Sequence, residues 1–333
     1  MIGVIGIDGA DLDITRRMIE RGDLPNMEAL SYDGQVHEIK TYLPAMSASV
    51  WTTYTTGVNP GRHGIFDFFK TGSVTELRTS VDVRVPRIWD ILSHHGKLCL
   101  VMNVPLTYPP RPINGVLVSG VMSKHNDGDT YPPEYKSLIQ PYVVEPSLDF
   151  EKSVGKDIVE EMYQVFNLRV NAFLRLLTHT RYDFFFVVFN IIDRGSHYYY
   201  GDEELEKMYM RVDEAVGDIS EVCEGWDLLC VSDHGFRRIH TYFFIEEWLR
   251  RRGFSNVTVS SQIIPNFVIR GLSRIAKIIP RDRELHRKVY HRYFQKRSEY
   301  HPESPVYFYS NSSRYLLCKH KEKDRVLDEL SSC

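Results

Sequence analysis

The chain has 333 residues, of which 43% are hydrophobic and 26% are charged. This is the composition of an ordinary soluble globular protein, and the length allows a large buried core. The formal net charge of −3 gives no general attraction to nucleic acid or to anionic membranes. We therefore expect no nucleic-acid partner.

The cysteines and the apolar segments indicate where the protein is found. Five cysteines without a C-x-x-C pair argue against a disulfide framework and fit a reducing compartment. The opening residues "MIGVIGIDGADLD" lack the basic stretch and the long apolar segment of a secretory signal. The longest apolar stretch, Phe184 to Ile192, is interrupted by Asn190 and falls far short of the ~20 residues that a membrane helix needs. We expect a cytoplasmic protein without a transmembrane segment.

Strands and helices alternate along the chain. The run "IGVIGI" at 2–7 is continuously apolar, as in a strand buried on both faces of a parallel sheet. Residues 156–178 repeat apolar side chains at steps of three and four, which predicts a long helix with one core-facing stripe. In chain order we predict strands at 2–7, 98–102, 115–120, 182–192 and 226–232, and helices at 13–21, before Gly96, at 156–178, 203–223 and 243–252. This order predicts an α/β fold with a mostly parallel sheet flanked by helices.

Residues 254–300 break this rhythm, because Lys and Arg far outnumber Asp and Glu in "RGLSRIAKIIPRDRELHRKVYHRYFQKR". We predict a catalytic core at 1–253, a basic helical cap inserted at 254–300, and a return to the core at 301–333. A truncated last part is the alternative. A solvated helix face is the simplest explanation of the cap's charge. The alternative is a basic surface that attracts anionic substrates or acidic lipid headgroups.

Three of the predicted strands run into an aspartate. Asp8 follows the first strand, Asp193 follows the run "FFFVVFNII", and Asp233 follows "WDLLCVS" with His234 directly after it. Ligands bind at the carboxyl ends of the strands in open α/β sheets. Asp8 taken alone could equally be a helix N-cap, but the three aspartates together predict a metal centre.

The spacing of these residues suits two metal ions. Asp193 and His197 are four residues apart, so one helical turn places both on one face. Asp233 and His234 are adjacent and converge only in a turn, for which Gly235 supplies conformational freedom. Asp and His together suit zinc, manganese or iron. Five such ligands are too many for one tetrahedral ion that keeps an open position.

The stretch "LPAMSASVWTTYTTGVNPGRHGIFDF" at 43–68 supplies a candidate nucleophile. Its Ser/Thr-rich run can enter a helix with Ser47 near the N-terminus, where backbone N–H groups favour a phosphoryl oxyanion. A serine beside a metal can ionise at neutral pH and become a nucleophile. A Ser/Thr-rich helix start is most often only a cap, so this role depends on the other motifs. His63 lies in a turn, for which a structural role is favoured over acid–base chemistry.

Several motifs resemble the alkaline phosphatase superfamily, in particular its prokaryotic type I phosphodiesterase/nucleotide pyrophosphatase-like branch. They are "GIDGAD", "PAMSASVWTTYTTGVNPGRHGIFDF", "NVPLTYPP", "GVLVSG", "DRGSH" and "SDHGF", and they run in order from residue 3 to about 253. The resemblance implies an alkaline phosphatase-like fold. It also implies two divalent metal ions as cofactors, zinc in the first place and manganese as the alternative.

The resemblance assigns the ligands to the two ions. Asp8, Asp233 and His234 would bind one ion, and Asp193 and His197 would bind the other. The nucleophile of the family lies ten residues before the glycine of a "TG" pair. Ser47 has that position here, where many relatives have Thr.

Two departures from the family pattern stand out. Relatives supply a third ligand to the second ion from a histidine near the C-terminus, and no such stretch follows residue 320. His240 is a weak substitute, because the matching position in relatives is not a ligand. Eukaryotic-type relatives also have an Asn shortly after "HGI", where this chain reads Phe66-Asp67-Phe68.

We therefore predict a metal-dependent hydrolase that cleaves phosphodiester or pyrophosphate bonds in a small phosphate-ester or nucleotide-like substrate through a phosphoseryl intermediate. One alternative is a phosphomonoesterase or a phosphoglycerate mutase-like enzyme of the same superfamily. The other is a shortened, non-catalytic relative that binds an anionic ligand or partner through the basic segment 270–297.

Overall fold

The computed structural model describes residues 1–33, 37–41, 45–70, 76–146, 158–238, 248, 251–253, 306–308 and 316–318. The chain divides into two compact units. One covers Met1–Phe69 and Leu77–Arg238, and the other covers Lys70–Glu76 and Ile239–Cys333. The predicted cap at 254–300 lies outside the described residues, as does most of the helix expected at 243–252. From 301–333 the structure describes two short antiparallel strands, β7 (Val306–Phe308) and β8 (Leu316–Cys318).

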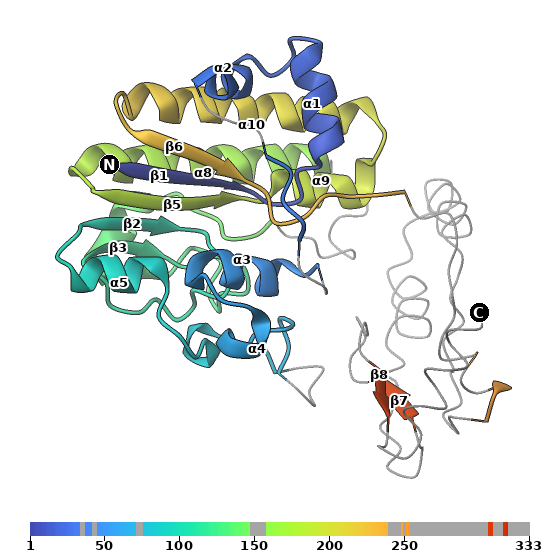
Figure 1. The fold of residues 1–333 in the computed structure, drawn as a ribbon. Helices are drawn as coiled ribbons and strands as arrows, with labels where there is room; N and C mark the ends of the chain where they lie inside the picture. The colour runs from blue at the N-terminus through green and yellow to red at the C-terminus, as the bar shows by residue number, and fades with distance from the viewer. Residues whose placement is uncertain are drawn as a thin grey trace, which may run out of the picture. The chain divides into compact units, whose positions relative to one another are not determined.

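A six-stranded sheet forms the centre of the first unit (Figure 1), with the strand order β4-β3-β2-β5-β1-β6. Neighbouring strands run parallel except for β4, which is antiparallel to β3. The strands are β1 (Ile2–Ile7), β2 (Cys99–Met102), β3 (Gly115–Val118), β4 (Thr130–Tyr131), β5 (Phe184–Phe189) and β6 (Asp227–Val231). The α/β fold with a mostly parallel sheet is confirmed.

Helices cover both faces of this sheet, and this explains the continuously apolar strands. Phe185 of β5 packs in one core layer with α1, α2, α8, α9 and α10, whereas Phe186 packs in the opposite layer with Trp51 and Trp89, which lie on α3 and α5. Successive side chains of a strand point to opposite faces, so a strand covered on both sides is apolar at every position. The helices are α1 (Leu12–Glu20), α2 (Pro25–Asp33), α3 (Ser47–Thr56), α4 (Pro60–His63), α5 (Ile88–His94), α6 (Lys136–Ile139), α8 (Ile158–His179), α9 (Ile191–Tyr199) and α10 (Glu203–Val222), with short 3₁₀ turns at Ser80–Asp82 and Pro133–Tyr135.

One predicted boundary is wrong in a way that matters for the site. The strand expected to reach residue 192 ends at Phe189, and α9 begins at Ile191. Ile191 and Ile192 are buried like the strand before them, and an apolar run does not by itself distinguish a buried strand from the start of a buried helix. Asp193 therefore lies in the first turn of a helix rather than directly at a strand end.

No helix in the part of the chain that the structure describes is long and apolar enough to cross a membrane.

The core around β5 generates a stability prediction. The Phe185 side chain is fully buried and its ring contacts Phe173 and Trp226. Phe185→Ala leaves a cavity between sheet and helices, and we expect it to lower the free energy of unfolding by about 3–5 kcal/mol. Leu229→Ala on β6, whose side chain is 54% exposed, should change it by less than about 0.5 kcal/mol. Urea unfolding followed by circular dichroism measures both, and equal effects would contradict this layer arrangement.

Candidate metal centre

The parallel register brings the three predicted aspartates to one edge of the sheet. The Asp8 N–H donates to the Phe189 carbonyl at the end of β5 (2.9 Å), and the Asp193 N–H donates to the Asp8 carbonyl (3.0 Å). On the other side of β1, Gly6 is in register with Val231 of β6, two residues before Asp233. The carboxyl ends of β5, β1 and β6 therefore place all three aspartates beside one another.

Asp8, Asp233 and His234 form one compact group, in which one ligand atom from each residue lies within 4.8 Å of the others. His234 Nε2 lies 3.8 Å from Asp8 Oδ1 and 3.4 Å from Asp233 Oδ2. Both aspartates are buried. Two carboxylates and one imidazole at this separation are a donor set that binds a divalent transition-metal ion.

Two glycines permit this close packing, because a side chain at either position would collide with a neighbouring aspartate. Gly9 has a φ of +76°, and a Cβ there would lie 2.7 Å from the Asp193 Cα. The Gly9 N–H also donates to Asp233 Oδ1 (3.1 Å). Gly235 was expected to provide a flexible turn, but its φ is not in the left-handed region. Its restriction is spatial, since a Cβ there would lie 2.5 Å from Asp11 Oδ2.

Ser47 is the first residue of α3, and its side chain reaches into this group. Its Oγ lies 3.4 Å from Asp8 Oδ1 and 3.2 Å from His234 Nε2. Four residues later, the Trp51 indole N–H donates to Asp8 Oδ2 (3.0 Å) from a fully buried position. One face of α3 thus supplies both the candidate nucleophile and a donor that holds Asp8.

The role of Trp51 could not be predicted from the sequence. Its apolar ring and the helical spacing indicate only a core position. The ring does lie in the core, where it packs against Phe186. The i, i+4 spacing from Ser47 is the one signal of a shared face. Tyr54 of the same helix also contacts the site. Its hydroxyl donates to the carbonyl of Ser232 (3.0 Å), the residue before Asp233.

The electrostatics of the group call for a cation. Burial, together with the neighbouring Asp233 and Asp193 charges, raises the pKa of Asp8 well above its usual range. Burial is also the main reason that the pKa of Asp233 is raised to about 7. The Asp233 Oδ2 atom is buried and has no hydrogen-bond partner among the described residues. Burying carboxylates without compensation is unfavourable. A divalent ion bound here would offset the surplus negative charge and would contact the unpaired Asp233 oxygen.

The second predicted pair lies beside this group. His197 Nε2 is 3.6 Å from Asp193 Oδ1 across one turn of α9, as the spacing predicted. Burial raises the pKa of Asp193, but His197, together with the Arg194 and His234 charges, lowers that pKa below its usual value. The Phe236 ring contacts both His197 and His234. A third protein ligand for this pair stays unidentified, because the candidate His240 lies outside the described residues.

His63 connects two helices within the fold. Its Nδ1 accepts a hydrogen bond from the Ile65 N–H (3.1 Å), and its Nε2 lies 3.0 Å from Thr53 Oγ1 on α3. Burial and the nearby Arg87 charge lower the pKa of His63 to about 4. The ring is therefore neutral at pH 7 with both nitrogens engaged, which agrees with the structural role that its turn setting favours.

Comparisons with known proteins extend this picture. The family model described as type I phosphodiesterase/nucleotide pyrophosphatase matches residues 3–325. No curated protein matches the chain. A solved structure of phosphonoacetate hydrolase from Sinorhizobium meliloti 1021, in complex with phosphonoformate, is similar with a TM-score of 0.57 and 17% identity over 75% of this chain and 61% of that chain. Murine ectonucleotide pyrophosphatase/phosphodiesterase 5 is similar with a TM-score of 0.50 and 14% identity over 77% and 63%.

The chain spans less than two thirds of the length of each of these solved structures. At such low identities the similarity establishes the fold alone. It confirms the alkaline phosphatase-like arrangement of a mostly parallel sheet between helical layers.

The raised pKa of Asp233 generates a prediction for the metal-free protein. The folded-state pKa of this carboxyl group is about 7, whereas its unfolded-state pKa is ~3.9. The free energy of unfolding therefore falls as the pH rises through this range, and the loss is complete above the folded-state pKa. Asp233→Asn removes the charge, and its Oδ1 can still accept from Gly9. We expect it to raise the free energy of unfolding in EDTA by on the order of 2 kcal/mol at pH 8, and by less at pH 5.

Chemical unfolding at the two pH values measures this difference. Asp227→Asn, an exposed carboxylate at the start of β6, is the matched control and should have no such effect. A destabilised Asp233→Asn protein at pH 8 would show that the carboxylate is already compensated without an ion.

Proposed function

This chain belongs to the type I phosphodiesterase/nucleotide pyrophosphatase family, and we propose that it is a metal-dependent hydrolase of phosphodiester or pyrophosphate bonds. The observation that carries the proposal is the position of Ser47. Its hydroxyl oxygen lies 3.4 Å from one candidate metal ligand, Asp8, and 3.2 Å from another, His234. A serine that is only a helix cap would have no reason to lie among buried carboxylates and an imidazole.

Among the described residues, one group fits a divalent ion and one pair supplies part of a second site. Asp8, Asp233 and His234 would hold one, and Asp193 and His197 would contribute to the other. Bound there, divalent ions lower the pKa of a neighbouring hydroxyl and stabilise negative charge on phosphoryl oxygens. Zinc suits this mixture of imidazole and carboxylate ligands, with manganese as the alternative.

Ser47 carries the chemical step in this proposal. Its Oγ forms a bond to phosphorus while the bond from phosphorus to the leaving oxygen breaks on the opposite side. The hydroxyl proton passes to solvent water, and the leaving oxygen departs with the electron pair of the broken bond. The N-terminus of α3, a ten-residue helix that begins at Ser47, presents backbone N–H groups and a positive dipole end to the phosphoryl oxygens. Water then attacks phosphorus, the bond from phosphorus to Oγ breaks, the phosphate product is released, and Ser47 Oγ takes up a proton again.

Trp51 and Gly9 act as positioning residues. The Trp51 N–H holds one oxygen of Asp8 and leaves the other, Oδ1, facing Ser47. The Gly9 N–H holds Asp233 Oδ1, whereas Oδ2 has no hydrogen-bond donor among the described residues and lies 3.4 Å from His234 Nε2. Each aspartate therefore keeps one oxygen fixed by the fold and one oxygen directed to the site.

The nucleophile assignment predicts the effect of one substitution. Ser47→Ala should lower turnover of bis-p-nitrophenyl phosphate by at least about 10³-fold, because the attacking oxygen is lost. The metal content should be unchanged, since Ser47 is not among the proposed ligands. Ser47→Thr keeps a hydroxyl and should retain measurable activity.

Thr56→Ala is the matched control, because its hydroxyl on the same helix donates to the Thr52 carbonyl away from the site. Full activity of Ser47→Ala would reject the nucleophile. The same assay run with p-nitrophenyl phosphate distinguishes a diesterase from a phosphomonoesterase. A metal-loaded protein that cleaves neither compound would favour a non-catalytic binding relative.

The proposed second ion predicts a change in metal stoichiometry. Elemental analysis of the purified protein should find two ions per chain, and His197→Ala should reduce this to one, because one ligand of an incomplete pair is lost. The His197 side chain is 59% exposed, so its removal leaves the core intact.

His125→Ala is the matched control. His125 forms an equivalent i, i+4 pair with Asp129, 3.0 Å apart and outside the site. Two ions retained in His197→Ala would remove His197 from the ligand set.

A further inference from the structure

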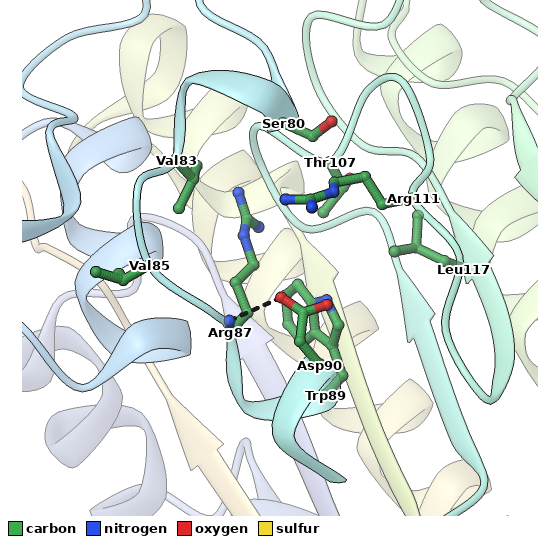
Figure 2. A pocket seen from close by; sticks show the side chains of 9 residues that line it. All are labelled: Ser80, Val83, Val85, Arg87, Trp89, Asp90, Thr107, Arg111 and Leu117. Carbon is green, nitrogen blue, oxygen red and sulfur yellow. Dashed lines mark hydrogen bonds between the residues drawn. The ribbon is translucent and has the colours of Figure 1, made fainter. Parts of the chain in front are cut away.

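A second cluster of charged side chains lines a pocket that shares no residue with the candidate metal centre. The pocket lies between the segment around Ser80, the start of α5 and the loop that leads into β3 (Figure 2). Two arginines, Arg87 and Arg111, line it together with Asp90, Trp89 and the hydroxyl-bearing Ser80 and Thr107.

The Arg87 guanidinium has one nitrogen, Nη1, that donates no hydrogen bond to a described residue. It is 5% exposed, and its guanidinium lies over the Trp89 ring, 5.2 Å from the ring centroid. Its Nη2 donates to the Leu106 carbonyl (2.7 Å), but its Nη1 is buried and has no partner among the described residues. A buried charged donor without an acceptor is costly, so an acceptor from outside the protein is expected in this pocket.

Arg111 adds a second positive charge to the same pocket. It is exposed, and no described acidic side chain forms an ion pair with it. Figure 2 shows the two guanidinium groups directed toward one another across the pocket. Burial is the main reason that the pKa of Arg87 falls to about 10, and the Arg111 charge lowers it further. An arginine side chain stays protonated in proteins, so the two positive charges repel one another.

The remaining polar groups do not cancel this charge. Asp90 is the one carboxylate lining the pocket, and its Oδ2 accepts from the Arg87 backbone N–H (2.8 Å). Two cations against one carboxylate leave a surplus of one positive charge. The Ser80 and Thr107 hydroxyls already donate to the carbonyls of Pro109 and Val104 (2.6 Å each). The guanidinium N–H groups are thus the donors that a ligand would meet.

We propose that this pocket binds a small oxyanion, for which inorganic phosphate is the probe, between Arg87 and Arg111, as a second anion site apart from the metal centre. Two planar guanidinium groups match an anion with several acceptor oxygens better than a monatomic anion. A bound phosphate group gives the orphan Nη1 of Arg87 its acceptor and relieves the repulsion between the two arginines. The inference does not depend on the catalytic role of Ser47.

The test is calorimetric titration of inorganic phosphate into the full chain in EDTA, so that no metal ion contributes to anion binding. We expect one binding site. Arg111→Ala should weaken it by about tenfold or more, since a charge-assisted contact is lost. Arg111 is exposed, so this variant should fold as the unsubstituted chain does. Arg87→Gln should have at least the same effect.

Arg84→Ala is the matched control, because Arg84 is an exposed arginine of the same segment that does not line the pocket. It should bind phosphate like the unsubstituted chain, as should Asp233→Asn in the candidate metal centre. A repeat with glycerol 2-phosphate distinguishes the free ion from an esterified phosphate group. An Arg111-dependent affinity for either compound supports the proposal.

Phosphate and glycerol 2-phosphate affinities that are the same in Arg111→Ala as in the unsubstituted chain would overturn the proposal. So would an absence of binding by the unsubstituted chain, which would indicate that water alone satisfies Arg87. If Arg87→Gln fails to fold, the Arg111→Ala result decides.

Discussion

Burial of two aspartates beside a third at one edge of a parallel sheet is the constraint on which the rest of the site depends. Asp8 and Asp233 are almost fully buried, and burial raises the pKa of both. Such an arrangement opposes folding unless something compensates it. Each aspartate has one oxygen held by a donor of the fold, from Trp51 or from Gly9. The other oxygens remain available to a ligand, so the unfavourable burial of these carboxylates would be offset by the cation that we propose.

The helix α3 connects the core to this site. Its Trp51 ring fills the layer against Phe186, while the indole N–H of the same side chain holds Asp8. Ser47, one turn earlier, lies at the helix start among the candidate ligands. Packing of α3 on the sheet therefore determines where the hydroxyl lies. In the proposed hydrolase, the element that covers the core would therefore also position the proposed nucleophile.

The charge at two sites of this protein differs strongly from the small net charge of the whole chain. The net charge of −3 indicates no preference for anions or cations. Yet the fold gathers carboxylates at the ends of β1 and β6, and gathers Arg87 and Arg111 in a separate pocket. We propose the acidic group as a cation site and the arginine pocket as an oxyanion site. Composition cannot predict either, because it does not record which charges the fold separates from their counterions.

The sequence by itself determined the α/β class, the order of the main strands and helices, and the residue types of the candidate site. Continuously apolar strands that run into Asp8 and Asp233 carry that information locally, and the i, i+4 spacing of Asp193 and His197 does so as well. Only the tertiary structure decided that β5 ends before Asp193, that Trp51 donates to Asp8, and that Arg87 keeps an unpaired donor in a pocket with Arg111. These features depend on contacts between segments far apart in the chain, and no local pattern of hydrophobicity or spacing encodes which buried donor meets which acceptor.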